Sequence, residues 1–134
     1  MIKLISPTFI VLPRKTKADR KIALNLNTYR NLHFQVNNQL KERYCDALQC
    51  SLRGLTLKVP ITLHYTYFKA SNRKSDRSNV LSIVEKFFLD ALVHYGCIPD
   101  DNDEFITSSH YYSGGVSKEP RVEIEINEQY SSKT

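Results

Sequence analysis

Two segments of this chain alternate apolar and polar residues. Residues 61–68 place Ile61 and its alternate neighbours on one side, and residues 121–126 place Val122, Ile124 and Ile126 on one side. A period of two is typical of a β-strand with one buried face. Weaker patterns predict strands at residues 6–12 and 105–112, and the alternation over residues 22–29 indicates a short strand or an extended segment.

A period near four predicts two helices. Residues 31–52 carry apolar side chains at every fourth position, from Leu32 to Leu48, which favours an amphipathic helix ended by Gly54. Residues 80–95 form the second predicted helix, with Ser78 or Asn79 as its N-cap and Gly96 at its C-cap position. On this helix Ser82, Lys86 and Asp90 are four residues apart and form one narrow polar stripe.

These elements predict a single domain over residues 1–134, of the α/β (α+β) class. We expect a mixed β-sheet of about four to five strands packed with two main helices. Residues 99–103 and 113–115 are predicted turns, and the chain from about residue 128 is expected to be a polar tail.

Composition narrows the function classes. The formal net charge is +5 and the pI is about 9.1, which favours a polyanionic partner, although solubility alone also explains such a charge. No apolar run reaches the roughly 18 residues of a membrane span, and the N-terminal residues indicate a strand and not a signal peptide. The three scattered cysteines favour buried free thiols in a cytosolic protein over a disulfide.

The candidate chemistry lies in a segment rich in aspartate. Five aspartates fall between residues 74 and 103, namely Asp76, Asp90, Asp100, Asp101 and Asp103, whereas the histidines and cysteines form no zinc-like cluster. Carboxylates in a basic chain suggest a divalent metal held against a polyanion. Alternatively, these aspartates are turn and cap residues, and Lys86 and Asp90 form an ordinary exposed ion pair. A shared metal site requires the chain after the second helix to fold back along it.

The order of residues in this segment is similar to that of a known family. Asp76 and Asn79 precede the helix, Lys86 lies within it, and the groups that follow are Asp90-Ala91-Leu92, Asp100-Asp101 and Arg121-Val122-Glu123-Ile124. In this order the chain resembles the RusA family of Holliday-junction resolvases, over about residues 61–126. The resemblance implies a homodimeric Mg²⁺-dependent endonuclease of DNA recombination and repair, with Mn²⁺ as a substitute ion. The resemblance further implies that its substrates are four-way junctions and other branched DNA, and that it acts in the cytoplasm of a bacterium or a phage-infected bacterial cell.

The resemblance also assigns roles. It implies that Asp76 and Asp101 hold the metal with Asp100 beside them, and that Lys86 assists catalysis. Asp90 either is a further metal ligand or orients Lys86.

Two departures from the family pattern matter. Ser78 stands where the family has its second aspartate, so that one ligand charge is missing. The interval from Asn79 to Asp90 is about four residues longer, a rotation of roughly 400° that nearly preserves the facing of later residues. The family spacing counted back from Asp90 places the catalytic lysine at Lys86. The same spacing counted forward from Asn79 places it at Ser82, which carries no positive charge, so we assign the role to Lys86. Two alternatives therefore stay open: a protein that binds branched DNA without cutting it, and a regulatory module that binds a protein.

Basic residues fall into three groups that could contact phosphates. Arg20, Lys21 and Arg121 belong to these groups, and the residues that we expect to bind DNA are Arg14, Lys15, Lys17, Lys69, Arg73, Lys74, Arg77 and Lys118. The tyrosines and phenylalanine near residues 65–68 and 111–112 are expected in the core or an interface and not as base-stacking platforms.

Overall fold

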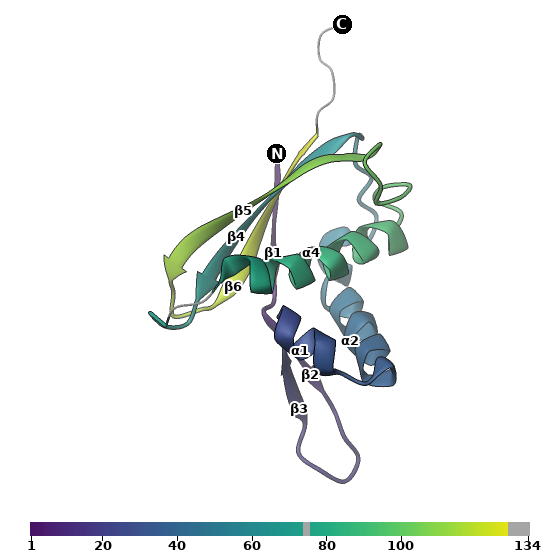
Figure 1. Cartoon of the computed structure of the whole chain (residues 1–134). Coiled ribbons are helices and arrows are strands. Elements are labelled where there is room, and N and C mark those ends of the chain that lie inside the picture. Colours follow the sequence, from purple (N-terminus) through teal and green to yellow (C-terminus); the bar gives the residue numbers. More distant parts are fainter. Residues whose placement is uncertain (74–75, 129–134) are drawn as a thin grey trace, which may run out of the picture.

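The computed structural model describes residues 1–73 and 76–128. Figure 1 shows a twisted sheet with one long helix lying across it and a β-hairpin that projects away from it. The elements in chain order are β1 (Ile2–Ser6), β2 (Phe9–Leu12), β3 (Arg20–Ala23), α1 (Leu26–Asn31), α2 (Phe34–Ala47), α3 (Gln49–Leu52), β4 (Ile61–Lys69), α4 (Arg77–His94), β5 (Ile106–Val116) and β6 (Arg121–Glu128).

The main sheet has four strands in the order β1-β6-β4-β5. β1 and β4 are antiparallel to β6, whereas β4 and β5 are parallel. Parallel neighbours need a crossover connection, and α4 provides it. β2 and β3 pair separately as a two-stranded hairpin. The expected α+β class, with a mixed sheet and α2 and α4 as its two main helices, is confirmed.

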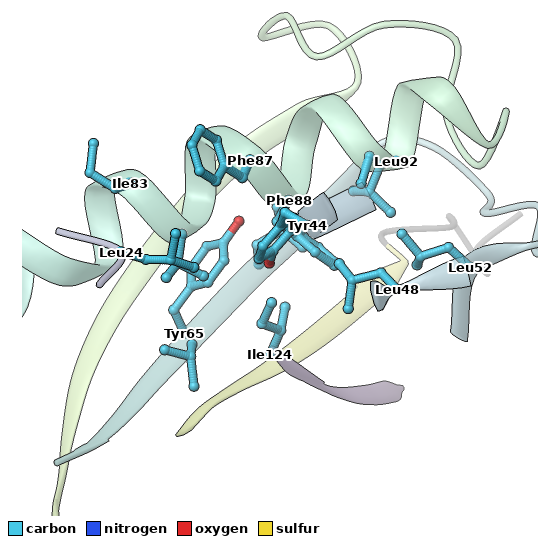
Figure 2. Packing of buried hydrophobic residues seen from close by; sticks show 14 of the residues in the cluster. Leu24, Tyr44, Leu48, Leu52, Tyr65, Ile83, Phe87, Phe88, Leu92 and Ile124 are labelled. Atoms are coloured by element: carbon cyan, nitrogen blue, oxygen red, sulfur yellow. The ribbon is translucent and has the colours of Figure 1, made fainter. Parts of the chain in front are cut away.

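The core lies between α4 and the sheet. The inward residues of the two clearest predicted strands are buried, including Leu63, Tyr65 and Ile124. They belong to one buried cluster with Phe88 and Leu92 of α4, and Figure 2 shows Tyr65 and Ile124 between that helix and the sheet. Tyr65 packs edge-on against Phe88, with ring centroids 6.3 Å apart. The predicted inward face of residues 121–126 is therefore confirmed.

The opposite face of the sheet carries the alternate residues of the same strands. His64 of β4 stacks on His110 of β5, with centroids 4.7 Å apart, and its Nδ1 lies 3.0 Å from the Tyr112 hydroxyl oxygen. Tyr112 is exposed, whereas Tyr65 is fully buried. The aromatic residues that were expected in the core or an interface thus divide between the two faces.

Several predicted boundaries were wrong. The predicted strand at residues 6–12 is the end of β1 and all of β2, and the segment at 22–29 is the end of β3 and the start of α1. α1 forms there because the Asn25 side chain caps it, accepting a 2.7 Å hydrogen bond from the backbone N–H of Thr28. The predicted helix at 31–52 is α2 followed by the separate short α3.

The ends of α4 and β5 also differ from the prediction. α4 begins at Arg77 and its N-cap is Asp76, not Ser78 or Asn79. Gly96 has φ +72°, the left-handed conformation expected just after a helix. Residues 113–115, predicted as a turn, continue β5 to Val116. The three cysteines are free, but only Cys97 is buried, while Cys45 is half-buried and Cys50 is exposed.

Candidate functional site

The segments that carry the basic residues all leave the main sheet at one end. Strand pairing sets Ser6 of β1 opposite Val122, Phe68 of β4 opposite Arg121, and Lys69 opposite Val116 of β5. β1, β4 and β5 therefore all end where β6 begins. The loop before α4, the turn between β5 and β6, and the hairpin that follows β1 all leave the sheet at this end (Figure 1). We call it the basic end.

Asp76 lies at the basic end, as the cap of α4. Its Oδ1 accepts hydrogen bonds from the backbone N–H of Ser78 at 3.0 Å and from the Ser78 hydroxyl at 2.7 Å. The Ser78 hydroxyl is the largest cause of a lowered Asp76 pKa, followed by the Ser78 backbone and the Arg77 charge. The carboxylate is therefore ionised at neutral pH and exposed to solvent. The carboxylate accepts a hydrogen bond from a free backbone N–H at the start of α4, and because it is exposed it is also available to a cation.

Asp100 and Asp101 lie at the opposite end. They belong to the turn between α4 and β5, where Asp100 Oδ1 accepts from the Asp101 N–H at 2.8 Å and Oδ2 accepts from the Asn102 side-chain amide at 3.2 Å. α4 has 18 residues and is roughly 27 Å long, so it separates this turn from Asp76. β5 runs back toward the basic end, but it begins at Ile106, after Asp100 and Asp101 in the sequence, so it does not carry them back. One chain does not bring Asp76 and Asp101 together.

Lys86 and Asp90 lie on the exposed stripe of α4. The Lys86 Nζ is 6.0 Å from the centre of the Tyr29 ring of α1. Asp90 borders a groove of about 350 Å³ between α2 and α4, together with Lys41, Asp46 and His94. Among the residues that the structure describes, Lys86 and Asp90 form no ion pair with each other. Their charges remain available to another molecule.

A metal site is not complete in one chain. Within the described ranges, no three or more His, Cys, Asp or Glu side chains gather closely enough to hold a metal ion. The oxygen donors have the right chemistry for Mg²⁺, but Asp76, Asp90 and the Asp100–Asp101 turn are spread along α4. The predicted ligand set does not fit one ion within one chain.

The predicted DNA-binding residues differ in exposure and in whether their side chains already form hydrogen bonds within the chain. The Arg14 Nε donates to the Ala18 carbonyl at 2.8 Å, and the Lys69 Nζ donates to the Arg73 carbonyl at 3.1 Å. Lys74 lies outside the described residues. The exposed basic side chains of the set are Arg14, Lys15, Lys17, Arg73, Arg77 and Lys118.

Arg121 has a structural role. It pairs with Glu123 at 2.9 Å and lies over the Phe68 ring at 4.2 Å, so it is less available to DNA than its charge suggested.

Sequence spacing did not single out Glu85. This side chain on α4 faces the sheet and accepts a hydrogen bond from the Tyr111 hydroxyl of β5. Burial is the main cause of a raised Tyr111 pKa, and the bond to Glu85 adds to it. Strand pairing sets Tyr111 of β5 beside Tyr65 of β4, and this places Tyr111 under α4, where it reaches Glu85. A single sequence does not reveal that pairing, so it could not have identified Glu85.

Comparison with known proteins adds no relative. No protein-family model matches the chain, and no curated protein matches its sequence. Across the residues that the structure describes, no helix combines the length and the apolar character needed to cross a membrane. The fold and the site thus define an α+β domain with a basic end and carboxylates at both ends of one helix.

Proposed function

We propose that this chain is a Mg²⁺-dependent, structure-selective endonuclease that resolves Holliday junctions and other branched DNA by paired nicking, in the cytoplasm of a bacterium or a phage-infected cell. One observation carries the proposal. Two basic segments, far apart in sequence, meet at the end of the sheet that holds Asp76, namely the loop before α4 and the turn between β5 and β6, and the hairpin with its basic loop leaves from the same end. Phosphates are the partner that such a surface attracts, and an ionised carboxylate among cations suits a site that cuts between phosphates.

The residue order adds the reaction class. The strand, helix and strand from Ile61 to Val116 carry Asp76, Lys86, Asp90 and the Asp100–Asp101 turn in the order that resembles the RusA family. In this proposal Lys86 interacts with phosphate charge, and the carboxylates supply the oxygen ligands.

The separation of the carboxylates implies a composite site in a homodimer. Consider two copies whose α4 helices lie antiparallel about a twofold axis, with Lys86 beside the partner subunit's Asp90. Moving ten residues back from Lys86 reaches Asp76, and moving ten forward from the partner's Asp90 reaches the partner's Asp100. Asp76 is then near the partner's acidic turn. A twofold axis creates two such sites, as paired nicking of two symmetric strands requires.

Mixed dimers test this proposal. Wild-type protein should nick a synthetic four-way junction in Mg²⁺, and Asp76→Asn and Asp101→Asn should each bind the junction but not cut it. After co-refolding of these two inactive variants, a composite site regains activity, because one of the two sites then combines wild-type Asp76 with wild-type Asp101. The expected product is a junction nicked in one strand.

The controls separate the claims. Mixtures of each variant with itself should stay inactive, and a Thr56→Ala variant, changed in an exposed loop residue, should cut normally. Inactive mixed dimers beside active wild type would reject the composite site. Binding by wild type without nicking in Mg²⁺ or Mn²⁺ would reject the enzyme.

Ser78 supports one second candidate, a protein that binds branched DNA without cutting it. Its hydroxyl donates to Asp76 where the family has a carboxylate, so the site has one negative charge fewer. Ser78→Asp distinguishes the candidates. If the wild type is silent for this reason, Ser78→Asp should start nicking. If the wild type is active, the added charge should shift only its metal requirement.

A further inference from the structure

The basic end holds a pocket next to Asp76. Its volume is about 250 Å³, and it lies between the hairpin, the end of β4 and the first turn of α4. Val80 lines it, and residues four apart on a helix lie one above the other, so the pocket is one helical turn from Asp76. The other lining residues used below are Phe9, Lys21, Ala23 and Tyr67.

The lining combines aromatic rings with one cation. Phe9 and Tyr67 are both partly exposed, and the Lys21 Nζ lies 4.0 Å from the centre of the Phe9 ring. Lys21 is the charged member, and the described lining residues include no carboxylate. A flat, apolar solute that carries negative charge beside its ring fits this combination. A nucleobase attached to its phosphate is such a solute.

We propose that this pocket receives one unstacked nucleobase of the branched DNA, next to the phosphate that is cut. The inference rests on the proposed function and deepens it. At the crossover of a junction two strands leave one helix for another, which interrupts the backbone path beside their bases, and displacing a base costs least where its stack is easiest to open. Phe9 and Tyr67 then provide the stacking faces, and Lys21 contacts the attached phosphate.

Photocrosslinking tests the proposal. 5-Iodouracil replaces single bases at the crossover of a four-way junction, which is bound in Ca²⁺ and irradiated, and crosslinked peptides are identified by mass spectrometry. We expect crosslinks at Phe9 or Tyr67 from one crossover position. Phe9→Leu should weaken junction binding about fivefold, the loss expected for one base–aromatic stacking contact.

Two further variants serve as controls. Ala23→Leu fills the pocket from the exposed side of β3 and removes no contact, so it should abolish the pocket crosslinks even if Phe9→Leu folds poorly. Phe34→Leu changes an aromatic residue that is 66% exposed on α2 and should leave crosslinking and affinity unchanged.

The outcomes separate this inference from the proposed function. A wild-type protein that nicks the junction but crosslinks only outside the pocket would overturn the nucleobase proposal alone. Pocket crosslinks that persist at full yield in folded Ala23→Leu would also overturn it. Absence of salt-dependent junction binding would overturn the proposed function and this inference together.

Discussion

At the scale of single residues, the contact between Ser78 and Asp76 has a measurable consequence. Because hydrogen bonding lowers the pKa of Asp76, the ionised cap stabilises α4 above the ordinary carboxyl pKa of 3.8. That stabilisation is lost as the pH falls through the lower folded-state pKa. Ser78→Ala removes the largest cause and keeps the backbone bond, so the Asp76 pKa should rise toward 3.8. Carboxyl NMR titration measures it, with Asn79→Ala as control, and an unchanged pKa would show that the hydroxyl is unimportant.

A second residue pair ties β1 to α2. The Ser6 hydroxyl donates to the Pro7 carbonyl at 3.0 Å and lies 2.7 Å from the Tyr44 hydroxyl, and both Ser6 and Tyr44 are fully buried. Tyr44→Phe should therefore lower the free energy of unfolding by about 1 kcal/mol. Urea denaturation measures the change. Tyr112→Phe, which loses an exposed hydroxyl, should cost less, and equal effects would contradict the role of burial.

The sequence could not select the cap residue. Asp76, Ser78 and Asn79 are all good N-caps, and the choice depends on how far the chain travels after β4 before it turns into the helix. The same limit applies to Lys86. Its position on an exposed stripe could be predicted from spacing, but its nearest ring, Tyr29, belongs to α1, a helix that the alternating pattern at 22–29 concealed.

At the scale of elements, β5 and β4 touch through a glycine. A Cβ added at Gly114 would lie 2.6 Å from the Phe68 ring, closer than atoms pack. Gly114→Ala should therefore destabilise the protein by about 1–3 kcal/mol, the range for overpacking. Thermal denaturation tests this, and the double variant with Phe68→Leu should recover much of the loss. An additive double variant would mean that the ring moves aside freely.

Patterning predicted elements best where one face is buried. β4, β6 and α4 were predicted because each has a continuous buried side. The end of β1 and all of β2 were predicted as one strand, although the two strands belong to different sheets. The residues at their junction, from Ser6 to Thr8, gave no pattern that indicates a break. Residues 113–115 read as a turn, yet the contact of Gly114 with Phe68 gives the glycine a packing role inside the strand.

At the scale of the whole molecule, the topology decides which predicted site residues meet. The aspartates were predicted from residue type and order, but their separation follows from the parallel pairing of β4 and β5, which requires α4 to run the full length of the sheet. The gathering of the basic segments depends on the same pairing. Neither follows from one sequence, because Arg77 and Lys118 are brought to the same end only by the pairing of β4 with β5.

The hairpin loop should contribute to the salt dependence of DNA binding. Lys15→Gln and Lys17→Gln each remove an exposed charge from the hairpin loop. Each should reduce the slope of log affinity against log salt by roughly 0.9 if that lysine contacts a phosphate of duplex DNA. Titrations of a four-way junction at several salt concentrations measure the slope. Arg53→Gln, a change of an exposed residue beyond α3, should leave the slope unaltered. If Arg53→Gln reduces the slope as much as the two lysine variants do, the attraction is non-specific.

The pairing of β1 with β6 has a consequence for chain connectivity. Ile2 lies opposite Ile126, so the first and last strands meet at the end of the sheet that is farthest from the hairpin loop (Figure 1). Chains with neighbouring ends tolerate circular permutation. A short linker that joins Thr134 to Met1, with new ends opened between Lys15 and Thr16, should fold cooperatively by circular dichroism. Ends opened within β4, between His64 and Tyr65, should abolish folding, since that strand pairs on both sides.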